Sequence, residues 1–355
     1  MIYLDHAATS PLHPKAREAM TDAMAVFGNP SSPHRAGTAA KALLEDSRRR
    51  MAECLGCDPK ELLFTSGGTE ANALALHGRS KVLTSPMEHP SVLKNVGDPL
   101  LLPVTGEGVV SLAGLEEALR KGVTAVSLQH ANNETGLLQP AEEAGVLCRR
   151  QGVIFHCDGV QAVGKMELCL RELPVDLYTF SAHKFGGPMG VGGLYRRAGT
   201  ELHPLYGGGS QEGGFRAGTE SALLAAGMAA ALEAVAKELV ETHAKLKELE
   251  ALLLPRLHAL GGVETGRGER IAGHLHLRFP GLDGEALTAG LDLFGVCISA
   301  GAACRSGSHT PSRTLLAMGF TPEEASEGLR ITLGRENTRE EILTFSALLE
   351  ELIRK

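Results

Sequence analysis

Short apolar runs alternate along the chain with longer stretches in which apolar residues recur every three or four positions. The short runs, rich in β-branched residues, predict strands at 62–65, 81–85, 124–129, 153–157, 176–180 and 191–195. The longer stretches predict helices at 36–54, 69–78, 112–120 and 141–151. This alternation indicates an α/β fold with a mainly parallel sheet covered by helices on both faces.

The pattern changes after a long helical stretch from about residue 220 to residue 259, whose last turns Pro255 is expected to interrupt. Shorter predicted elements follow at 273–279, 284–291, 294–299, 311–318, 328–333 and 338–353. We therefore expect two domains. The large parallel-sheet domain spans residues 12–240, and residues 1–11 and 241–355 form a smaller α+β domain.

Charge and composition argue against two classes of protein. The 355 residues include 35 Lys and Arg against 42 Asp and Glu, a net charge of −7, so a nucleic-acid binder or a polybasic membrane-surface protein is disfavoured. No apolar run approaches the ~18 residues of a membrane span, and the first residues lack the pattern of a secretory leader. Seven scattered cysteines do not form a disulfide framework. We expect a cytoplasmic protein with no nucleic-acid or membrane partner.

Polar clusters follow the predicted strands, where ligands bind in open α/β sheets. The segment Ser66-Gly67-Gly68-Thr69-Glu70 opens a helix and is suited to an anion such as phosphate, although Ser66 or Thr69 could simply cap that helix. His89 and the polar run 130–136 follow two further strands. Each of these signals is weak when taken alone.

Asp158 and Lys184 follow two buried strands. A buried Asp needs a partner such as a protonated ring nitrogen, and a desolvated Lys has the lowered pKa that an imine-forming amine needs. The alternative for Lys184 is a surface loop lysine. Taken in order, the Asp158-x-x-Gln161 and Ser181-x-His183-Lys184 motifs form the pattern expected for bound pyridoxal phosphate.

The chain resembles the class V aminotransferase superfamily, and more narrowly the NifS/IscS-type cysteine desulfurases, in motifs spread from residue 2 to about residue 340. These motifs are Tyr3-Leu4-Asp5-His6-Ala7-Ala8-Thr9, Gly28-Asn29-Pro30-Ser31-Ser32, Ser66 to Glu70, Glu88-His89, Asn132-Asn133-Glu134, Asp158 to Gln161, Ser181 to Lys184, Gly213 to Thr219, Ala303-Cys304 and Leu329 to Arg335.

This resemblance implies a homodimeric enzyme of pyridoxal phosphate fold-type I that converts L-cysteine to L-alanine and leaves sulfane sulfur on an enzyme cysteine. It implies catalytic roles for Lys184 as the Schiff-base lysine, for Cys304 as the sulfur acceptor and for His89 as a ring-stacking acid/base group. The cofactor-binding residues that it implies are Gly68, Thr69, His89, Asn133, Asp158, Gln161, Ser181, His183, Lys184 and, from the second subunit, Thr219. The implied substrate-binding residues are Asn29, Asn133 and Arg330.

Cys304 distinguishes desulfuration from the other chemistries of the superfamily. Its surroundings are rich in Gly, Ala and Ser, which favours a mobile loop over the alternative of a buried packing residue. The motif before it is Ala-Gly-Ala-Ala rather than the more usual Ser-Gly-Ser-Ala. By resemblance, sulfur passes to an iron–sulfur scaffold or a sulfur-carrier protein for iron–sulfur cluster assembly or tRNA thiolation, and Cys304 is a transient [2Fe–2S] ligand.

Other readings stay open at this point. A selenocysteine lyase or an aminotransferase of the same superfamily is the main alternative. A metal-binding or scaffold protein without catalysis is a second. Cys54 and Cys57 have C-x-x-C spacing, but no second pair accompanies them, and we interpret them as structural thiols.

Overall fold

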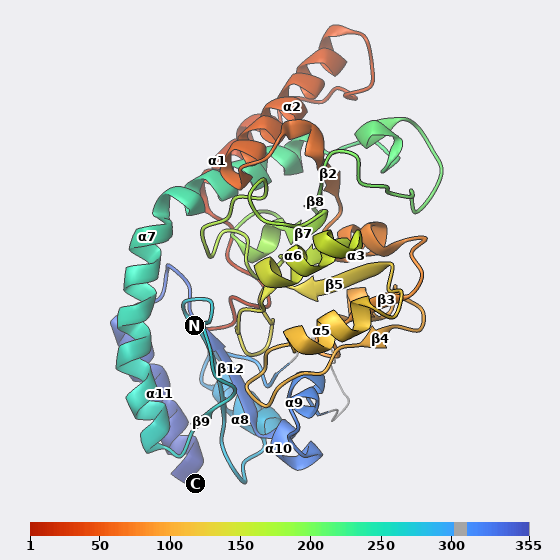
Figure 1. Cartoon of the computed structure of the whole chain (residues 1–355). Helices are drawn as coiled ribbons and strands as arrows, with labels where there is room; N and C mark the ends of the chain where they lie inside the picture. Colours follow the sequence, from red (N-terminus) through yellow and green to blue (C-terminus); the bar gives the residue numbers. More distant parts are fainter. Residues whose placement is uncertain (302–310, 355) are drawn as a thin grey trace.

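The computed structural model describes residues 1–301 and 311–354 (Figure 1). Its centre is a seven-stranded sheet of order β2-β8-β7-β6-β5-β3-β4. β8 runs antiparallel to both of its neighbours, and the other pairs are parallel. The strands are β2 (Leu62–Thr65), β3 (Val82–Thr84), β4 (Leu100–Leu101), β5 (Ala125–Gln129), β6 (Ile154–Asp158), β7 (Leu177–Ser181) and β8 (Gly192–Arg196).

Helices cover both faces of this sheet, because alternate side chains of each strand point to opposite sides. Phe155 and Tyr178 belong to the core that packs against α2, α5, α6 and the first part of α7. Leu177 and Leu194 belong to the core on the other face, against α3 and α4. The helices are α1 (Pro14–Ala23), α2 (Arg35–Leu55), α3 (Gly68–Leu76), α4 (Pro90–Leu93), α5 (Leu112–Leu119), α6 (Ala141–Gln151) and α7 (Ala222–Ala259).

A second, smaller group of elements packs against the C-terminal part of α7. It holds the antiparallel sheet β12-β10-β9 and the parallel pair β1-β11, so the N-terminal strand lies among C-terminal elements. Its elements are β1 (Ile2–Tyr3), β9 (Val263–Glu264), β10 (His274–Arg278), α8 (Gly284–Leu293), β11 (Val296–Cys297), α9 (Arg313–Ala317), α10 (Pro322–Ser326), β12 (Gly328–Thr332) and α11 (Arg339–Arg354).

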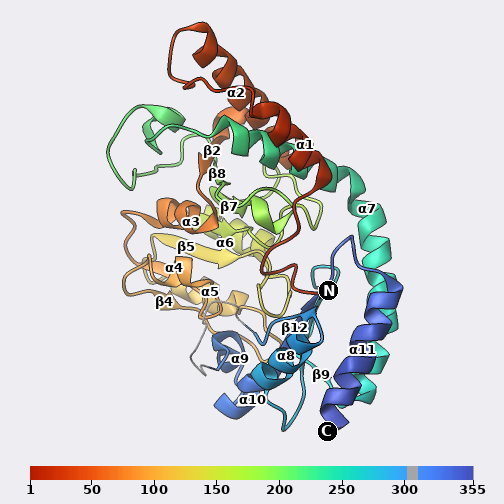
Figure 2. The same ribbon diagram turned by 180° about the vertical axis from the view of Figure 1, so that it is seen from behind.

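The helix α7 connects the two cores, as Figures 1 and 2 show from opposite sides. Its residues up to Val235 pack on the large sheet, whereas those from Leu246 onward join a separate core with α8, α11 and β10. The predicted division at residue 240 lies between these two stretches and stays a prediction. Among the described residues, no helix combines the length and the apolar character needed to cross a bilayer.

The fold confirms the predicted α/β class and all of the predicted strands of the large sheet. The expected interruption at Pro255 is wrong, since α7 continues to Ala259. Leu253 and Leu257 on either side are fully buried, and their packing offsets the roughly 3 kcal/mol that an internal proline costs. The short elements α1, α4, α10, β4 and β9 were not predicted, because two to ten residues give little periodicity to detect.

Candidate active site

A cavity of about 450 Å³ opens at the carboxyl ends of β5, β6 and β7. Most of the predicted site residues line it together, although they come from segments spread over more than 260 positions of the chain. These residues are Gly68, Thr69, His89, Asn133, Asp158, Gln161, Ser181, His183, Lys184 and Arg330.

Asp158 ends β6 inside this cavity and is almost fully buried. Its Oδ2 accepts a hydrogen bond from Asn72 Nδ2 at 2.7 Å, and its Oδ1 accepts one from the Val160 N–H at 3.0 Å. Asn72 also donates to Ser91 Oγ at 2.9 Å. Because each carboxylate oxygen offers more than one acceptor site, Asp158 can still accept a hydrogen bond from a ligand.

Sequence reasoning missed Asn72, which orients the Asp158 carboxylate. The available signal was an amide side chain inside the otherwise apolar face of a helix, between Ala71 and Leu74. The sequence does not tell what this amide contacts. Its partner becomes clear only in the fold, where α3 lies beside the end of β6.

The Lys184 amine lies in the wall of the cavity, directly after β7. A short 3-10 turn over residues 182–184 follows the strand, and Lys184 Nζ donates to the carbonyl oxygens of Ala7 (2.6 Å) and Ala8 (2.8 Å). Gln161 Nε2 donates to the same Ala7 oxygen at 2.9 Å. The N-terminal segment therefore holds both side chains toward the cavity. This arrangement rules out a surface loop lysine.

The N-terminus of α3 faces the cavity. Its N-cap is Gly67, whose φ of 152° favours glycine, and within residues 1–301 and 311–354 this helix start has no side-chain cap hydrogen bond. The alternative that Ser66 or Thr69 merely caps this helix is therefore wrong. A Cβ on Gly68 would lie 2.8 Å from Val160 Cγ2, so any other residue here would force the Val160 side chain to shift. Uncapped N–H groups at a helix N-terminus bind anions.

Two histidines flank the cavity in their neutral form. His89 is the N-cap of α4, where its Nδ1 accepts a hydrogen bond from the Ser91 N–H at 3.1 Å. Burial lowers the pKa of His89. Burial also lowers the pKa of His183 to about 4, and its Nδ1 lies 3.1 Å from Thr9 Oγ1. Neutral imidazoles at pH 7 can accept as well as donate a proton.

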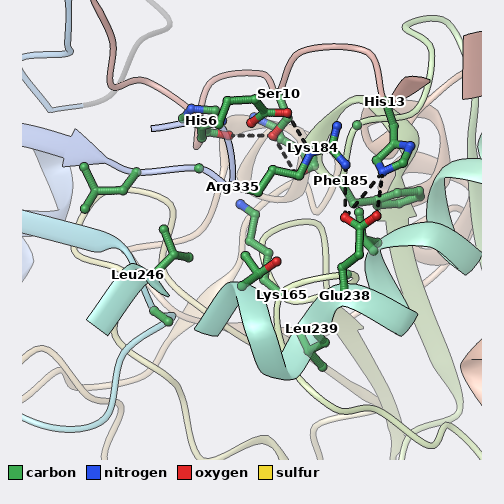
Figure 3. Close-up of a pocket in the computed structure, with 18 of the residues that line it drawn as sticks. His6, Ser10, His13, Lys165, Lys184, Phe185, Glu238, Leu239, Leu246 and Arg335 are labelled. Atoms are coloured by element: carbon green, nitrogen blue, oxygen red, sulfur yellow. Dashed lines mark hydrogen bonds and ion pairs between the residues drawn. The ribbon is translucent and has the colours of Figure 1, made fainter. Parts of the chain in front are cut away.

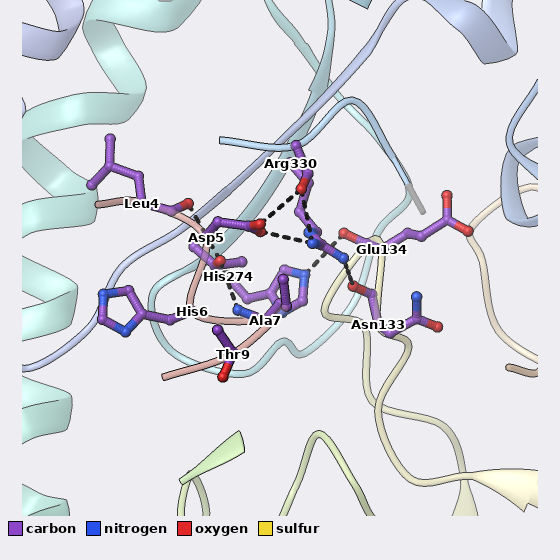
Figure 4. A network of polar contacts seen from close by, with 12 residues as sticks. Leu4, Asp5, His6, Ala7, Thr9, Asn133, Glu134, His274 and Arg330 are labelled. Atoms are coloured by element: carbon purple, nitrogen blue, oxygen red, sulfur yellow. Dashed lines mark hydrogen bonds and ion pairs between the residues drawn. The ribbon is translucent and has the colours of Figure 1, made fainter. Parts of the chain in front are cut away.

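Arg330 of β12 brings a buried guanidinium to the cavity edge, between Asp5 and Asn133 (Figure 4). Its Nη2 donates to Asp5 Oδ1 at 2.7 Å and to Ser299 Oγ at 3.1 Å, and its Nη1 donates to the Asn133 carbonyl at 2.9 Å. Within the described part of the chain, its buried Nε has no hydrogen-bond partner. Arg330 lines the cavity, and a guanidinium suits a carboxylate ligand.

Comparison with known proteins identifies the family of this chain. The aminotransferase class-V family matches residues 2–345. The chain is 38% identical to the cysteine desulfurase IscS of Dictyoglomus turgidum over 373 aligned positions, covering all of this chain and 95% of that protein. The chain belongs to the cysteine desulfurases of the aminotransferase class-V family.

Solved structures of the same family agree with this assignment. A NifS-like protein from Rickettsia africae superposes with a TM-score of 0.93 at 32% identity, covering 100% of both chains. A structure described as SspA in complex with cysteine superposes with a TM-score of 0.82 at 29% identity, covering 95% of this chain and all of that one. The relatives favour cysteine desulfurase activity over the selenocysteine lyase or aminotransferase alternative.

Cysteine desulfurases of this family depend on pyridoxal phosphate, and the residues of the cavity fit that cofactor. The uncapped α3 N-terminus, with a glycine where a Cβ would collide, suits the phosphate. The Asp158 carboxylate suits a protonated ring nitrogen, and the Lys184 amine lies in the same cavity.

Two predicted site residues of the described chain, Asn29 and Thr219, do not line this cavity. Asn29 is exposed, and its Oδ1 accepts a hydrogen bond from the Ser31 N–H at 2.9 Å. Thr219 is exposed as well, and its predicted role belongs to a second subunit. Cys304 lies outside the described residues.

Within the described part of the chain, the other six cysteines take part in no metal-binding group. Burial raises the pKa of Cys54 to about 11 and that of Cys57 to about 12, which keeps both as thiols at pH 7. In residues 1–301 and 311–354, no group of three or more His, Cys, Asp or Glu side chains is arranged to hold a metal ion.

Proposed function

We propose that this cavity binds pyridoxal phosphate and L-cysteine, and that its residues carry out the desulfuration of L-cysteine to L-alanine. One observation carries the proposal. An amine, a buried carboxylate, a helix N-terminus that begins at a glycine and a guanidinium meet in a single cavity. The structure of SspA with cysteine, a relative of this chain, supports the choice of substrate.

Different cavity residues would bind different parts of the cofactor. The α3 N-terminus with Gly68 and Thr69, together with Ser181 and His183, would hold the phosphate. Asp158, oriented by Asn72, would accept a hydrogen bond from the ring nitrogen and keep it protonated. Gln161 and Asn133 would bind the ring oxygen, and His89 would pack against the ring.

Bound pyridoxal phosphate supplies an aldehyde for amines and an electron-withdrawing ring that stabilises negative charge at the substrate Cα. Lys184 supplies the amine that attaches the cofactor and later takes up or returns a proton. Burial lowers the pKa of His89, so its ring is neutral at pH 7 and can take up a proton. Arg330 binds the substrate carboxylate, which fixes the orientation of the cysteine side chain.

Cys304 is the proposed sulfur acceptor. Its thiolate attacks the substrate sulfur, so a sulfur–sulfur bond forms and the carbon–sulfur bond breaks. The electron pair of the broken bond stays with the substrate carbon, which takes up a proton on the way to the methyl group of alanine, and the sulfur stays on Cys304 as a persulfide. We further propose that the enzyme is a homodimer in which Thr219 reaches the partner's cavity, and that Asn29 assists in binding the substrate. An iron–sulfur scaffold or a sulfur carrier then takes the sulfur, with Cys304 as a transient ligand of the cargo cluster. The cytoplasmic location stays a prediction.

The test is product formation by two variants beside the wild-type enzyme. With L-cysteine, a reductant and pyridoxal phosphate, the wild type should release alanine and sulfide in equal amounts. Lys184→Ala should lose both the products and the covalently bound cofactor, whereas Cys304→Ala should lose sulfide release and keep the cofactor. Wild-type rates in either variant would contradict the assigned role of that residue.

A further inference from the structure

A second, smaller cavity of about 90 Å³ lies behind Lys184, against α7 (Figure 3). Lys184 contributes to both cavities, and Lys165 lines the smaller one. Lys165 lies in the turn region after β6, four residues beyond Gln161. The roles proposed above do not involve this second amine.

Lys165 connects to the larger cavity through one side chain. Its Nζ donates to Gln161 Oε1 at 2.9 Å, while Gln161 Nε2 donates to the Ala7 carbonyl at 2.9 Å. Lys184 Nζ donates to that same Ala7 oxygen at 2.6 Å. A continuous chain of hydrogen bonds therefore leads from Lys165 through Gln161 and Ala7 to the amine that is proposed to attach the cofactor.

This chain fixes which way the Gln161 amide points. A lysine ammonium has only donors, so the amide must turn its oxygen toward Lys165. The amide nitrogen then faces Ala7 and the cavity. One of its two hydrogens is used on Ala7, and the other is left for an acceptor in the cavity. If Lys165 were absent, the Ala7 carbonyl would be the one described contact left to hold the amide in this orientation, and rotation by 180° would break one hydrogen bond instead of two.

We propose that Lys165 is a positioning residue, which orients the Gln161 amide so that its N–H, and not its oxygen, meets the cofactor's ring oxygen. This inference rests on the proposed function of the cavity. It adds a residue of the smaller cavity that acts through Gln161 and touches neither the substrate nor the cofactor.

The electrostatic surroundings of Lys165 agree with a role in orientation. Removal of the ammonium from water, with Lys184 and Arg330 adding to the effect, lowers the pKa of Lys165 to about 7. A neutral amine still donates N–H to Gln161, so the contact does not depend on the charge. The other titratable groups that line the same cavity are His6, His13, Glu238, His243, Arg335 and Glu336.

The consequence concerns the proton on the Lys184 nitrogen of the holoenzyme. An amide N–H donated to the ring oxygen stabilises its negative charge and so favours loss of that proton. An amide oxygen turned to the same place does the opposite. Lys165→Met should therefore raise the pH at which the visible absorbance of the bound cofactor changes, by roughly one unit.

The experiment is a pH titration of that absorbance in the holoenzyme without substrate. Lys165→Arg keeps the hydrogen-bond donor, so its titration should shift by no more than about half as much as that of Lys165→Met. Lys245→Met is the matched control, because Lys245 Nζ donates to the Arg335 carbonyl and has no hydrogen bond with Gln161. It should titrate as the wild type does.

A double variant tests whether Lys165 acts through Gln161. In a Gln161→Ala background, Lys165→Met should produce about a third of its original shift or less. An equal shift in both backgrounds, or a Lys165→Met enzyme that titrates like the wild type, would overturn the inference and leave the proposed function intact. Borohydride reduction of the wild-type enzyme distinguishes failure of this inference from failure of the proposed function. If reduction left no pyridoxyl group on Lys184, the inference and the proposed function would both be overturned.

Discussion

The Gly-rich segment that ends at Thr219 depends on one buried ion pair, and breaking that pair should destabilise the protein strongly. Glu212 sits in this segment with a φ of 48°, a conformation that L-residues rarely adopt. Its Oε1 and Oε2 accept hydrogen bonds from Arg48 Nη2 (2.7 Å) and Nη1 (2.8 Å). Oε2 also accepts one from the Phe64 N–H at 2.8 Å. The Glu212 side chain is 0% exposed, and that of Arg48 is 9% exposed.

Glu212→Ala removes all three hydrogen bonds and leaves the backbone strain nearly unchanged, so it isolates the side-chain contribution. Loss of one partner of a buried pair typically costs about 3–5 kcal/mol. The carboxylate of the half-exposed Glu45 lies 3.3 Å from Arg48 Nε and still compensates part of the Arg48 charge. We therefore expect the free energy of unfolding to fall by about 3 kcal/mol. In urea this corresponds to a fall in the unfolding midpoint of about 1 M.

The assay is urea unfolding followed by circular dichroism, with Glu117→Ala as the control. Glu117 pairs with Lys121 on the surface of α5, where both side chains are about 70% exposed, and loss of such a pair costs about 0.5 kcal/mol or less. If Glu212→Ala lowered the midpoint no more than Glu117→Ala, the assignment of a structural role to the buried pair would be refuted.

Three further predictions concern a tightly packed glycine, the Arg330 guanidinium and three buried histidines. Gly159→Ala should prevent folding or lower the melting temperature sharply, because its Cβ would lie 1.9 Å from Tyr178 Cε1, whereas Gly207→Ala meets nothing within 4 Å and should melt like the wild type. Arg330→Lys should raise the KM for L-cysteine roughly 10- to 100-fold in an alanine-release assay, since lysine cannot form two parallel hydrogen bonds to a carboxylate; an unchanged KM would remove Arg330 from substrate binding. Stability should fall as the pH drops from 7.5 to 5, by about 1–2 kcal/mol for each buried neutral histidine, because the unfolded chain takes up protons near pH 6.5 that the folded chain cannot; a constant urea midpoint over that range would contradict it. These histidines are His130, His156 and His276, whose pKa values burial lowers to about 4, 3 and 3.

The sequence predicted the strand ends and most of the cavity residues, and it missed the contacts that orient them. Asp158 and Lys184 were predictable because the first ends a buried strand and the second lies three residues beyond the end of one. Asn72 and Lys165 were not, because their roles depend on which neighbour the fold brings within 3 Å. The carbonyl of Ala7 carries no side-chain signal at all.

The direction of β8 was beyond sequence reasoning for a related reason. Its apolar run Gly192–Arg196 is compatible with either direction, and only its antiparallel pairing with β2 and β7 in the sheet decides between them. The path of α7 through Pro255 was likewise decided by tertiary packing of Leu253 and Leu257. Local preference and tertiary packing disagree at such positions, and the packing prevails.

The most direct measurement of the central claim is mass spectrometry of the intact enzyme and its peptides after exposure to L-cysteine without a reductant. The account predicts an added mass of one sulfur atom on the peptide that contains Cys304, absent from the Lys184→Ala variant. Sulfur located on another cysteine, or its appearance on Cys304 without the Lys184 amine, would contradict it.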